Sequence, residues 1–201
     1  MKLKKSKICH TNFLKTLILF HKYYKKPGLS FHQFKSLVSA YSYPRKVRVV
    51  SFKKDDYYNI FPMDLIGEIA SCNKYIFGLR HTNITLDKII ETKKIVASEV
   101  SFNQKNIIYQ LGEHHGAGAP PILSLPFRTM LSRQFKFYVP EWVESYKEIK
   151  IIRTINLGSH MLLWGEVMNE EKISAPTGNL YHIHFLQYFH QKRNGFNYPL
   201  V

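Results

Sequence analysis

The sequence predicts a mainly β protein with helical additions, in which about six strands form a closed or heavily covered barrel. From residue 46 onward, short segments rich in β-branched and aromatic residues alternate with polar clusters, a pattern typical of strands and turns. The candidate strands are apolar on both faces, which favours a barrel over an open sheet with one solvent-exposed face. A single strong helical pattern interrupts them, between the second and the third strand.

The strands are expected at six places, bounded by turn-forming residues. These are residues 47–52, 74–80, 95–100, 135–139, 148–157 and 160–168. In the fourth, Phe135 and Phe137 alternate with Lys136 and Tyr138, as side chains do on opposite faces of a strand. The helix is expected over 83–90, because Asn83 or Thr85 can cap its N-terminus and its apolar residues recur at helical spacing.

The charge is concentrated at the N-terminus. The formal net charge is +15, yet residues 1–46 hold eleven Lys or Arg and no acidic residue, which leaves 18 basic and 14 acidic residues in the rest. We therefore expect a basic, partly helical extension over 1–44, with helical patterns at 14–24 and 31–40, and a domain over 45–201 that ends in a C-terminal tail. The extension is either a solvated leader or an electrostatic anchor for a nucleic acid or an anionic membrane.

Targeting and metal signals are weak. Lys15 interrupts a short apolar run near the N-terminus, and no segment approaches the roughly 20 apolar residues of a membrane-spanning helix, so a cytoplasmic protein without a membrane span is expected. Cys9 and Cys72 lie far apart in no ligand-like spacing. His182 and His184 would share a strand face, but no Asp, Glu or Cys lies nearby to complete a metal site, and none is predicted.

Residues 77–85 have the composition of a phosphate site, because a predicted strand runs directly into a helix start. Such a junction collects backbone N–H groups, and Arg80 adds a guanidinium that can bind a phosphate through two hydrogen bonds. Thr82, Asn83 and Thr85 add hydroxyl and amide groups. The alternative is that Asn83 or Thr85 merely caps the helix and Arg80 is a surface charge.

Residues 57–67 follow the first strand and a polar hairpin at 53–56. Pro62 lacks a ladder N–H, which favours an edge strand or a bulge and leaves neighbouring backbone groups free for a ligand. A flat heteroaromatic ring needs such a surface. A plain hairpin with a proline bulge explains the residues equally well. Gly-rich loops followed by Lys and Gly-x-Ser-x-Gly elbows are missing from the sequence, which excludes the common kinase and hydrolase patterns.

Together these segments resemble the flavin reductase-like group of FMN-binding split β-barrels, over roughly residues 44–170. The resemblance is carried by residues 59–64, by 79–83 and by Gly158-Ser159-His160 leading into 163–167, which ends in Gly-Glu-Val. The sequence departs from the pattern of this family at two places. Ser159 stands where the family commonly has an acidic residue, and Cys72-Asn73 stands where many members have a Pro-Pro pair.

The resemblance implies a six-stranded antiparallel Greek-key split β-barrel that binds FMN noncovalently at the interface of a homodimer. The residues along the ring would be Asn59, Ile60, Phe61, Pro62 and Met63, and those around the ribityl chain and phosphate Arg80, His81, Thr82, Asn83 and Thr85. His160 would lie near the flavin or the nicotinamide and is the candidate catalytic residue.

The expected activity is electron transfer from NADH or NADPH to the flavin, or onward to a redox partner. The hydride chemistry would belong to the cofactor, and the protein would supply stacking, anchoring and hydrogen bonds. A flavin carrier or electron-transfer protein without nicotinamide specificity is the alternative within this fold. A nucleic-acid-associated module that uses the basic N-terminus is the alternative of another class, which the near-neutral body makes less favourable.

Overall fold

The structure is a computed structural model that describes residues 30, 44–112, 120–158 and 160–182. The expected helical segments at 14–24 and 31–40, most of the basic extension, Ser159 and His184 lie outside the described residues.

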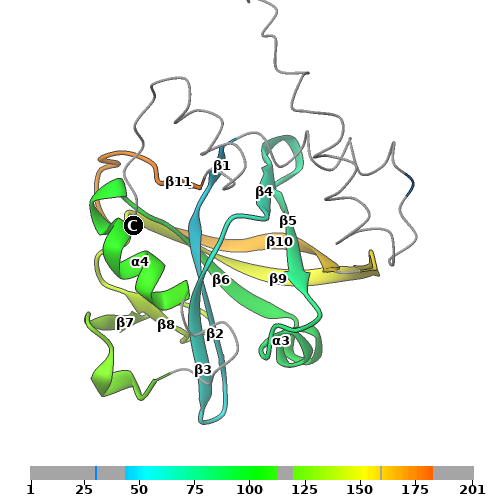
Figure 1. The fold of residues 1–201 in the computed structure, drawn as a ribbon, viewed down its shortest axis with the longest axis horizontal. Coiled ribbons are helices and arrows are strands. Elements are labelled where there is room, and N and C mark those ends of the chain that lie inside the picture. Colours follow the sequence, from blue (N-terminus) through cyan, green and yellow to red (C-terminus); the bar gives the residue numbers. More distant parts are fainter. Residues whose placement is uncertain (1–29, 31–43, 113–119, 159, 183–201) are drawn as a thin grey trace, which may run out of the picture. The chain divides into compact units, whose positions relative to one another are not determined.

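Seven antiparallel strands form one sheet, in the order β3-β2-β6-β9-β10-β5-β4 (Figure 1). The strands are β2 (Arg48–Lys54), β3 (Tyr57–Met63), β4 (Ile66–Ile69), β5 (Lys74–Arg80), β6 (Lys94–Glu99), β9 (Ser145–Asn156) and β10 (His160–Lys172). The β2–β3, β4–β5 and β9–β10 pairs are hairpins, whereas β6 is inserted between β2 and β9. Asp55 makes the first hairpin turn possible by taking a left-handed conformation, with φ 51°.

The sheet is rolled, because its two edge strands follow each other in the chain. β3 ends at Met63 and β4 begins at Ile66, and three Cα steps span at most about 11 Å. A flat sheet of this many strands would separate its edges by about 29 Å. The sheet must therefore curl until β3 and β4 approach each other at one corner, as in a barrel.

The shorter elements cover the ends and sides of this sheet. They are β1 (Arg45–Lys46) paired with β11 (Tyr181–His182), β7 (Thr129–Leu131) paired with β8 (Tyr138–Pro140), α3 (Leu86–Thr92), α4 (Lys105–Gly112), η2 (Ala70–Cys72), η3 (Phe102–Gln104) and η4 (Ile122–Ser124). In Figure 1, α3 and α4 lie on different sides of the β2–β3 hairpin. Each helix buries one face, Leu86 and Ile89 from α3 and Ile108 and Leu111 from α4.

The core lies inside the rolled sheet and is strongly apolar. Val50, Phe77, Ile95, Ile149 and Leu163 all have exposed fractions of 0% and come from five different strands. Fully burying one such side chain contributes roughly 1.5–3 kcal/mol. The core thus joins strands that are distant in the sequence.

The predicted fold class is confirmed: the protein is mainly β with helical additions, and α3 lies between β5 and β6 as expected. The strand at 74–80 coincides with β5, and those at 47–52, 95–100, 148–157 and 160–168 overlap β2, β6, β9 and β10. The seven-stranded sheet contains five of the six expected strands together with β3 and β4, which were not among the six. Pro62 lies on β3, which is an edge strand, as its missing N–H favours.

The prediction of a strand at 135–139 is wrong for its first half, because only Tyr138–Pro140 forms a strand, β8. Phe135 lies in a turn and Lys136 is left-handed, with φ 57°. The buried carboxylate of Glu148 accepts hydrogen bonds from the backbone N–H groups of Gln134 and Phe135, at 2.9 and 2.6 Å. These bonds favour the turn over an extended backbone, and the alternation of aromatic residues reflects packing rather than a strand.

None of the helices in the described ranges has the length and apolar character that crossing a membrane requires.

Candidate functional site

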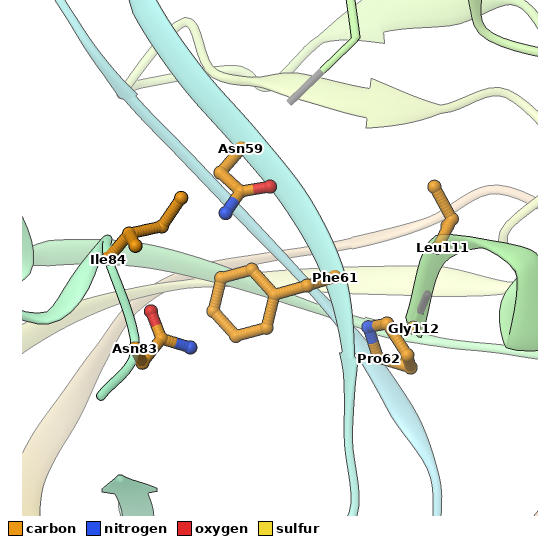
Figure 2. A pocket seen from close by; sticks show the side chains of 7 residues that line it. All are labelled: Asn59, Phe61, Pro62, Asn83, Ile84, Leu111 and Gly112. Carbon is orange, nitrogen blue, oxygen red and sulfur yellow. The ribbon is translucent and has the colours of Figure 1, made fainter. Parts of the chain in front are cut away.

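A small pocket of about 20 Å³ lies where three elements meet (Figure 2). Its lining residues come from the edge strand β3, from the turn before α3 and from the end of α4; they are Asn59, Phe61, Pro62, Asn83, Ile84, Leu111 and Gly112. The two segments that sequence analysis assigned to a ring and to a phosphate therefore line one pocket, although about 20 residues separate them in the chain.

The β3 wall presents three of the five predicted ring-contacting side chains to the pocket. Asn59, Phe61 and Pro62 line it, whereas Ile60 and Met63, with exposed fractions of 4% and 8%, point into the core. Figure 2 shows the Phe61 ring between the Asn59 and Asn83 amides. Only the backbones of Ile60 and Met63 are therefore available to a ligand.

The turn before α3 is held by its own backbone. Asn83 N–H donates to Arg80 O at 3.0 Å, Leu86 N–H to Asn83 O at 3.0 Å, and Thr85 N–H to the Asn83 side-chain Oδ1 at 2.9 Å. We expected this junction to offer unused N–H groups to an anion, and three of them are instead satisfied within the turn. Binding of a phosphate here depends on side chains more than on the backbone.

Arg80, His81 and Thr82 are exposed at the end of β5. His81 Nε2 lies 3.3 Å from Asn156 Oδ1 at the end of β9. The guanidinium and the Thr82 hydroxyl are thus the groups of this turn that reach solvent beside the pocket-lining Asn83. Arg80 is the strongest candidate for an anion ligand, since guanidinium–phosphate hydrogen bonds are charge-assisted.

His160 begins β10 directly opposite Arg80 on β5. Burial lowers the pKa of His160 below its ordinary value, and the positive charges of Arg80 and His81 lower it further. The imidazole is therefore mainly neutral near pH 7 and can both donate and accept hydrogen bonds. The structure brings His160 to the Arg80 turn, but not into the lining of the pocket.

Thr85 differs from the other predicted phosphate contacts because it is completely buried. Asn59 Nδ2 donates a hydrogen bond to Thr85 Oγ1 at 2.8 Å, and the Tyr57 hydroxyl lies 2.9 Å from the same oxygen. Its side chain thus joins the α3 turn to β3.

Leu111 and Gly112 are pocket residues that sequence analysis missed. A Cβ on Gly112 would lie 3.4 Å from Pro62 Cγ, so this glycine lets the end of α4 approach the edge strand closely. The signal for α4 was present in the sequence: Ser101 precedes the segment, Ile107, Ile108 and Leu111 recur at helical spacing, and a glycine ends it.

Comparison with solved structures finds several flavin proteins of similar fold. An FMN-binding protein from Thermus thermophilus, with bound 1-cyclohex-2-enone, superposes with a TM-score of 0.61 at 16% identity, over 70% of this chain and 83% of that one. The flavin reductase component of a bacterial two-component tryptophan halogenase gives 0.60 at 12% identity, over 70% and 88%. An NADH:FAD oxidoreductase from Streptomyces globisporus gives 0.57 at 14% identity, over 72% and 84%.

No protein-family model matches the sequence, and no curated protein is similar enough to match. At identities this low the likeness concerns the fold and not the activity. The fold of this chain is that of FMN-binding proteins and flavin reductases, which confirms the resemblance to the flavin reductase-like group at the level of structure.

Proposed function

We propose that this protein binds FMN noncovalently in the pocket between β3 and the α3 turn and acts as a flavin reductase-like oxidoreductase. The observation that carries the proposal is the meeting of Asn59, Phe61 and Pro62 with Asn83 around one pocket, beside Arg80. These residues were assigned to a ring and to a phosphate from separate parts of the sequence.

The lining residues fit FMN by their chemistry, although the pocket would have to widen beyond its present 20 Å³ to take the ring. Phe61 and Pro62 offer a flat apolar wall, and the amides of Asn59 and Asn83 offer donors and acceptors at its rim. Arg80 supplies a cation for the dianionic phosphate, and the Thr82 hydroxyl can complete its hydrogen bonds. The pocket is open on one side, so a second surface would have to cover the far side of the ring.

The reaction would be a hydride transfer in which NADH or NADPH is oxidised and the bound flavin, which supplies the electron-accepting ring, is reduced. The chain's own contribution would be to place and to shield the reactants. Phe61 and Pro62 would exclude water from one face, and Arg80 would anchor the phosphate end. The neutral His160 imidazole would hydrogen-bond the nicotinamide carboxamide.

Two proteins of similar fold support this proposal through the molecules that are bound in their crystals. The Thermus thermophilus protein has also been crystallised with p-hydroxybenzaldehyde, and the Streptomyces globisporus enzyme with NAD and FAD fragments. The small molecules bound in these crystals support a second substrate beside the flavin for this chain.

The test is the absorbance of the purified full-length chain after FMN addition and desalting, followed by anaerobic stopped-flow mixing with NADH and with NADPH. We expect flavin bands that survive desalting and that bleach rapidly with one of the two nucleotides. Retained flavin that neither nucleotide bleaches would identify a flavin carrier, whereas colourless protein would remove the proposal.

The open side of the pocket favours a homodimer with the flavin at the interface. Light scattering of the eluting protein should give twice the 23.7 kDa of one chain. A mass of one chain in the presence of FMN would contradict the dimer.

A further inference from the structure

A second and much larger hollow lies on another part of the surface, beside η4 and the start of β7. Its volume is about 510 Å³, which is in the range of small-molecule sites, whereas the pocket beside β3 holds about 20 Å³. The described residues that line it are Ile122, Leu123, Leu125, Phe127, Arg128, Thr129 and Glu141. None of them lines the β3 pocket, so this hollow, the η4 groove, is a separate site.

The η4 groove has an apolar wall that is only partly covered. Ile122, Leu125 and Phe127 are half-buried, and Leu123 has an exposed fraction of 97%. The Phe127 ring packs edge to face against Trp142, with ring centroids 5.6 Å apart, so a second aromatic residue supports the wall. An apolar group of a ligand would cover surface here that is now in contact with water.

One cation and one anion lie side by side in the same groove. Thr129 of β7 pairs with Pro140 of β8. The Glu141 N–H donates to Arg128 O at 3.1 Å, which extends this pairing by one residue. Residues directly opposite on antiparallel strands have Cβ atoms about 5 Å apart and side chains on the same face. Both side chains are exposed, and the ion pairs of the described residues include neither Arg128 nor Glu141. Both charges are therefore available to a ligand.

We propose that the η4 groove binds a free α-amino acid with an apolar side chain. The Arg128 guanidinium would donate to the α-carboxylate, and the Glu141 carboxylate would accept from the α-ammonium group. These two groups of the ligand are attached to one carbon atom and have opposite charges, as the two neighbouring side chains do. The ligand's own side chain would lie against Leu125 and Phe127. The site goes beyond the proposed flavin function and does not depend on it.

A ligand with a single charge fits the groove less well. An aromatic carboxylate would contact Arg128 but would bring its negative charge close to Glu141, and an amine would bring its positive charge close to Arg128. A zwitterion places an opposite charge at each side chain. An α-amino acid has this charge pattern, whereas a fatty acid or the interior of a peptide lacks it.

The experiment is a titration of the full chain that follows Trp142 fluorescence, because Trp142 contacts the Phe127 ring of the groove wall. Trp164→Phe removes the other tryptophan of the chain and serves as the parent protein. The ligands are L-phenylalanine, L-phenylalaninamide, which lacks the carboxylate, and N-acetyl-L-phenylalanine, which lacks the ammonium group. We expect L-phenylalanine to bind more tightly than either analogue by about threefold to tenfold, as for the loss of one charge-assisted contact at an exposed position.

Each charge variant is the matched control for the other. Arg128→Gln should remove the preference for L-phenylalanine over its amide and keep the preference over the N-acetyl form, and Glu141→Gln should do the reverse. Arg133→Gln, at an exposed arginine outside the groove that pairs with Glu171 at 2.8 Å, should change neither preference. Circular dichroism reports whether each variant folds, and the comparison of the three ligands on the parent protein remains decisive if one does not.

The outcomes separate this site from the flavin site. Equal binding of the three ligands, binding of none of them, or preferences that both charge variants leave unchanged would overturn the amino-acid site. Absorbance of the same samples after FMN addition and desalting reports flavin binding independently. A chain that selects L-phenylalanine in this way and retains no FMN would keep the amino-acid site and remove the flavin proposal.

Discussion

Arg80 is the residue on which anchoring of the phosphate depends. It is exposed at the end of β5, next to the turn that carries Asn83, and hydrogen bonds from a charged donor contribute about 1.5–3 kcal/mol. We expect Arg80→Ala to weaken FMN binding by about tenfold to a hundredfold in fluorescence titrations. Arg133→Ala is the matched control, since that exposed arginine pairs with Glu171 at 2.8 Å and lies outside the pocket. Equal effects of the two substitutions would argue against a phosphate contact at Arg80.

His160 should make the stability of the ligand-free protein depend on pH. Its pKa is lowered from 6.5 by burial and by the charges of Arg80 and His81, so the unfolded state binds more protons between the folded pKa and 6.5. Stability should therefore fall as the pH drops through this window, and His160→Gln should remove that part of the loss. The contribution of His160 is measured by comparing the melting temperatures of wild type and variant at pH 7.5 and pH 5. If the melting temperatures of both proteins fall equally between these pH values, His160 does not contribute to the pH dependence.

At the scale of elements, the register between β9 and β10 depends on Gly165. The pairing shifts between Trp164 and Gly165, and a Cβ on Gly165 would overlap Ile149 Cγ2 and lie 3.3 Å from Phe77 Cε2. We expect Gly165→Ala to destabilise the fold by about 1–3 kcal/mol, as overpacked cores are. Gly67→Ala on β4, where a Cβ meets nothing within 4 Å, should change the midpoint of urea unfolding little.

The corner between β3 and β4 is tied down by Asp64. Its carboxylate accepts hydrogen bonds from Arg45 at 2.6 Å and contacts His182 Nδ1 at 2.6 Å, so it joins the corner to both β1 and β11. Burial by itself would raise the pKa of Asp64, but the hydrogen bond to His182 and the charge of Arg45 lower it to about 2.

Asp64 should therefore stabilise the fold above pH 3.8, and this contribution should be lost as the pH falls toward 2. We expect Asp64→Asn to lower the free energy of unfolding by about 1–3 kcal/mol at pH 7 and by about half as much at pH 3, because the folded pKa of about 2 lies below that pH. Asp56→Asn, in the exposed hairpin turn, is the control. A difference from wild type that is the same at both pH values would contradict the role of the carboxylate charge.

The elements that sequence reasoning found are those whose signals are local. The helix after Asn83 and the strand ending at Arg80 show periodicity in their own residues, and so their junction was placed correctly, although the expected cap residue Thr85 makes no side-chain capping bond. β4 was missed because this short strand is defined by its pairing with β5, which periodicity does not report, whereas α4 was missed although its helical spacing is visible in the sequence. The turn at Phe135 was missed for a related reason: Glu148, which holds it, lies on another strand.

At the scale of the whole molecule, the excess positive charge and the predicted flavin site lie in different parts of the sequence. The near-neutral body contains the rolled sheet and the pocket, whereas most of the excess positive charge belongs to residues 1–46. Each flavin role proposed here uses residues of the body alone. The separate role of the basic extension stays a prediction, and an FMN site in the body neither requires nor excludes it.

The most direct test of the central claim is a crystal structure of the full chain grown with FMN. We expect the ring to lie against Phe61 and Pro62 and the phosphate to lie within hydrogen-bonding distance of the Arg80 guanidinium. FMN bound elsewhere on the molecule, or a pocket closed by the protein's own side chains in the presence of saturating FMN, would contradict the account.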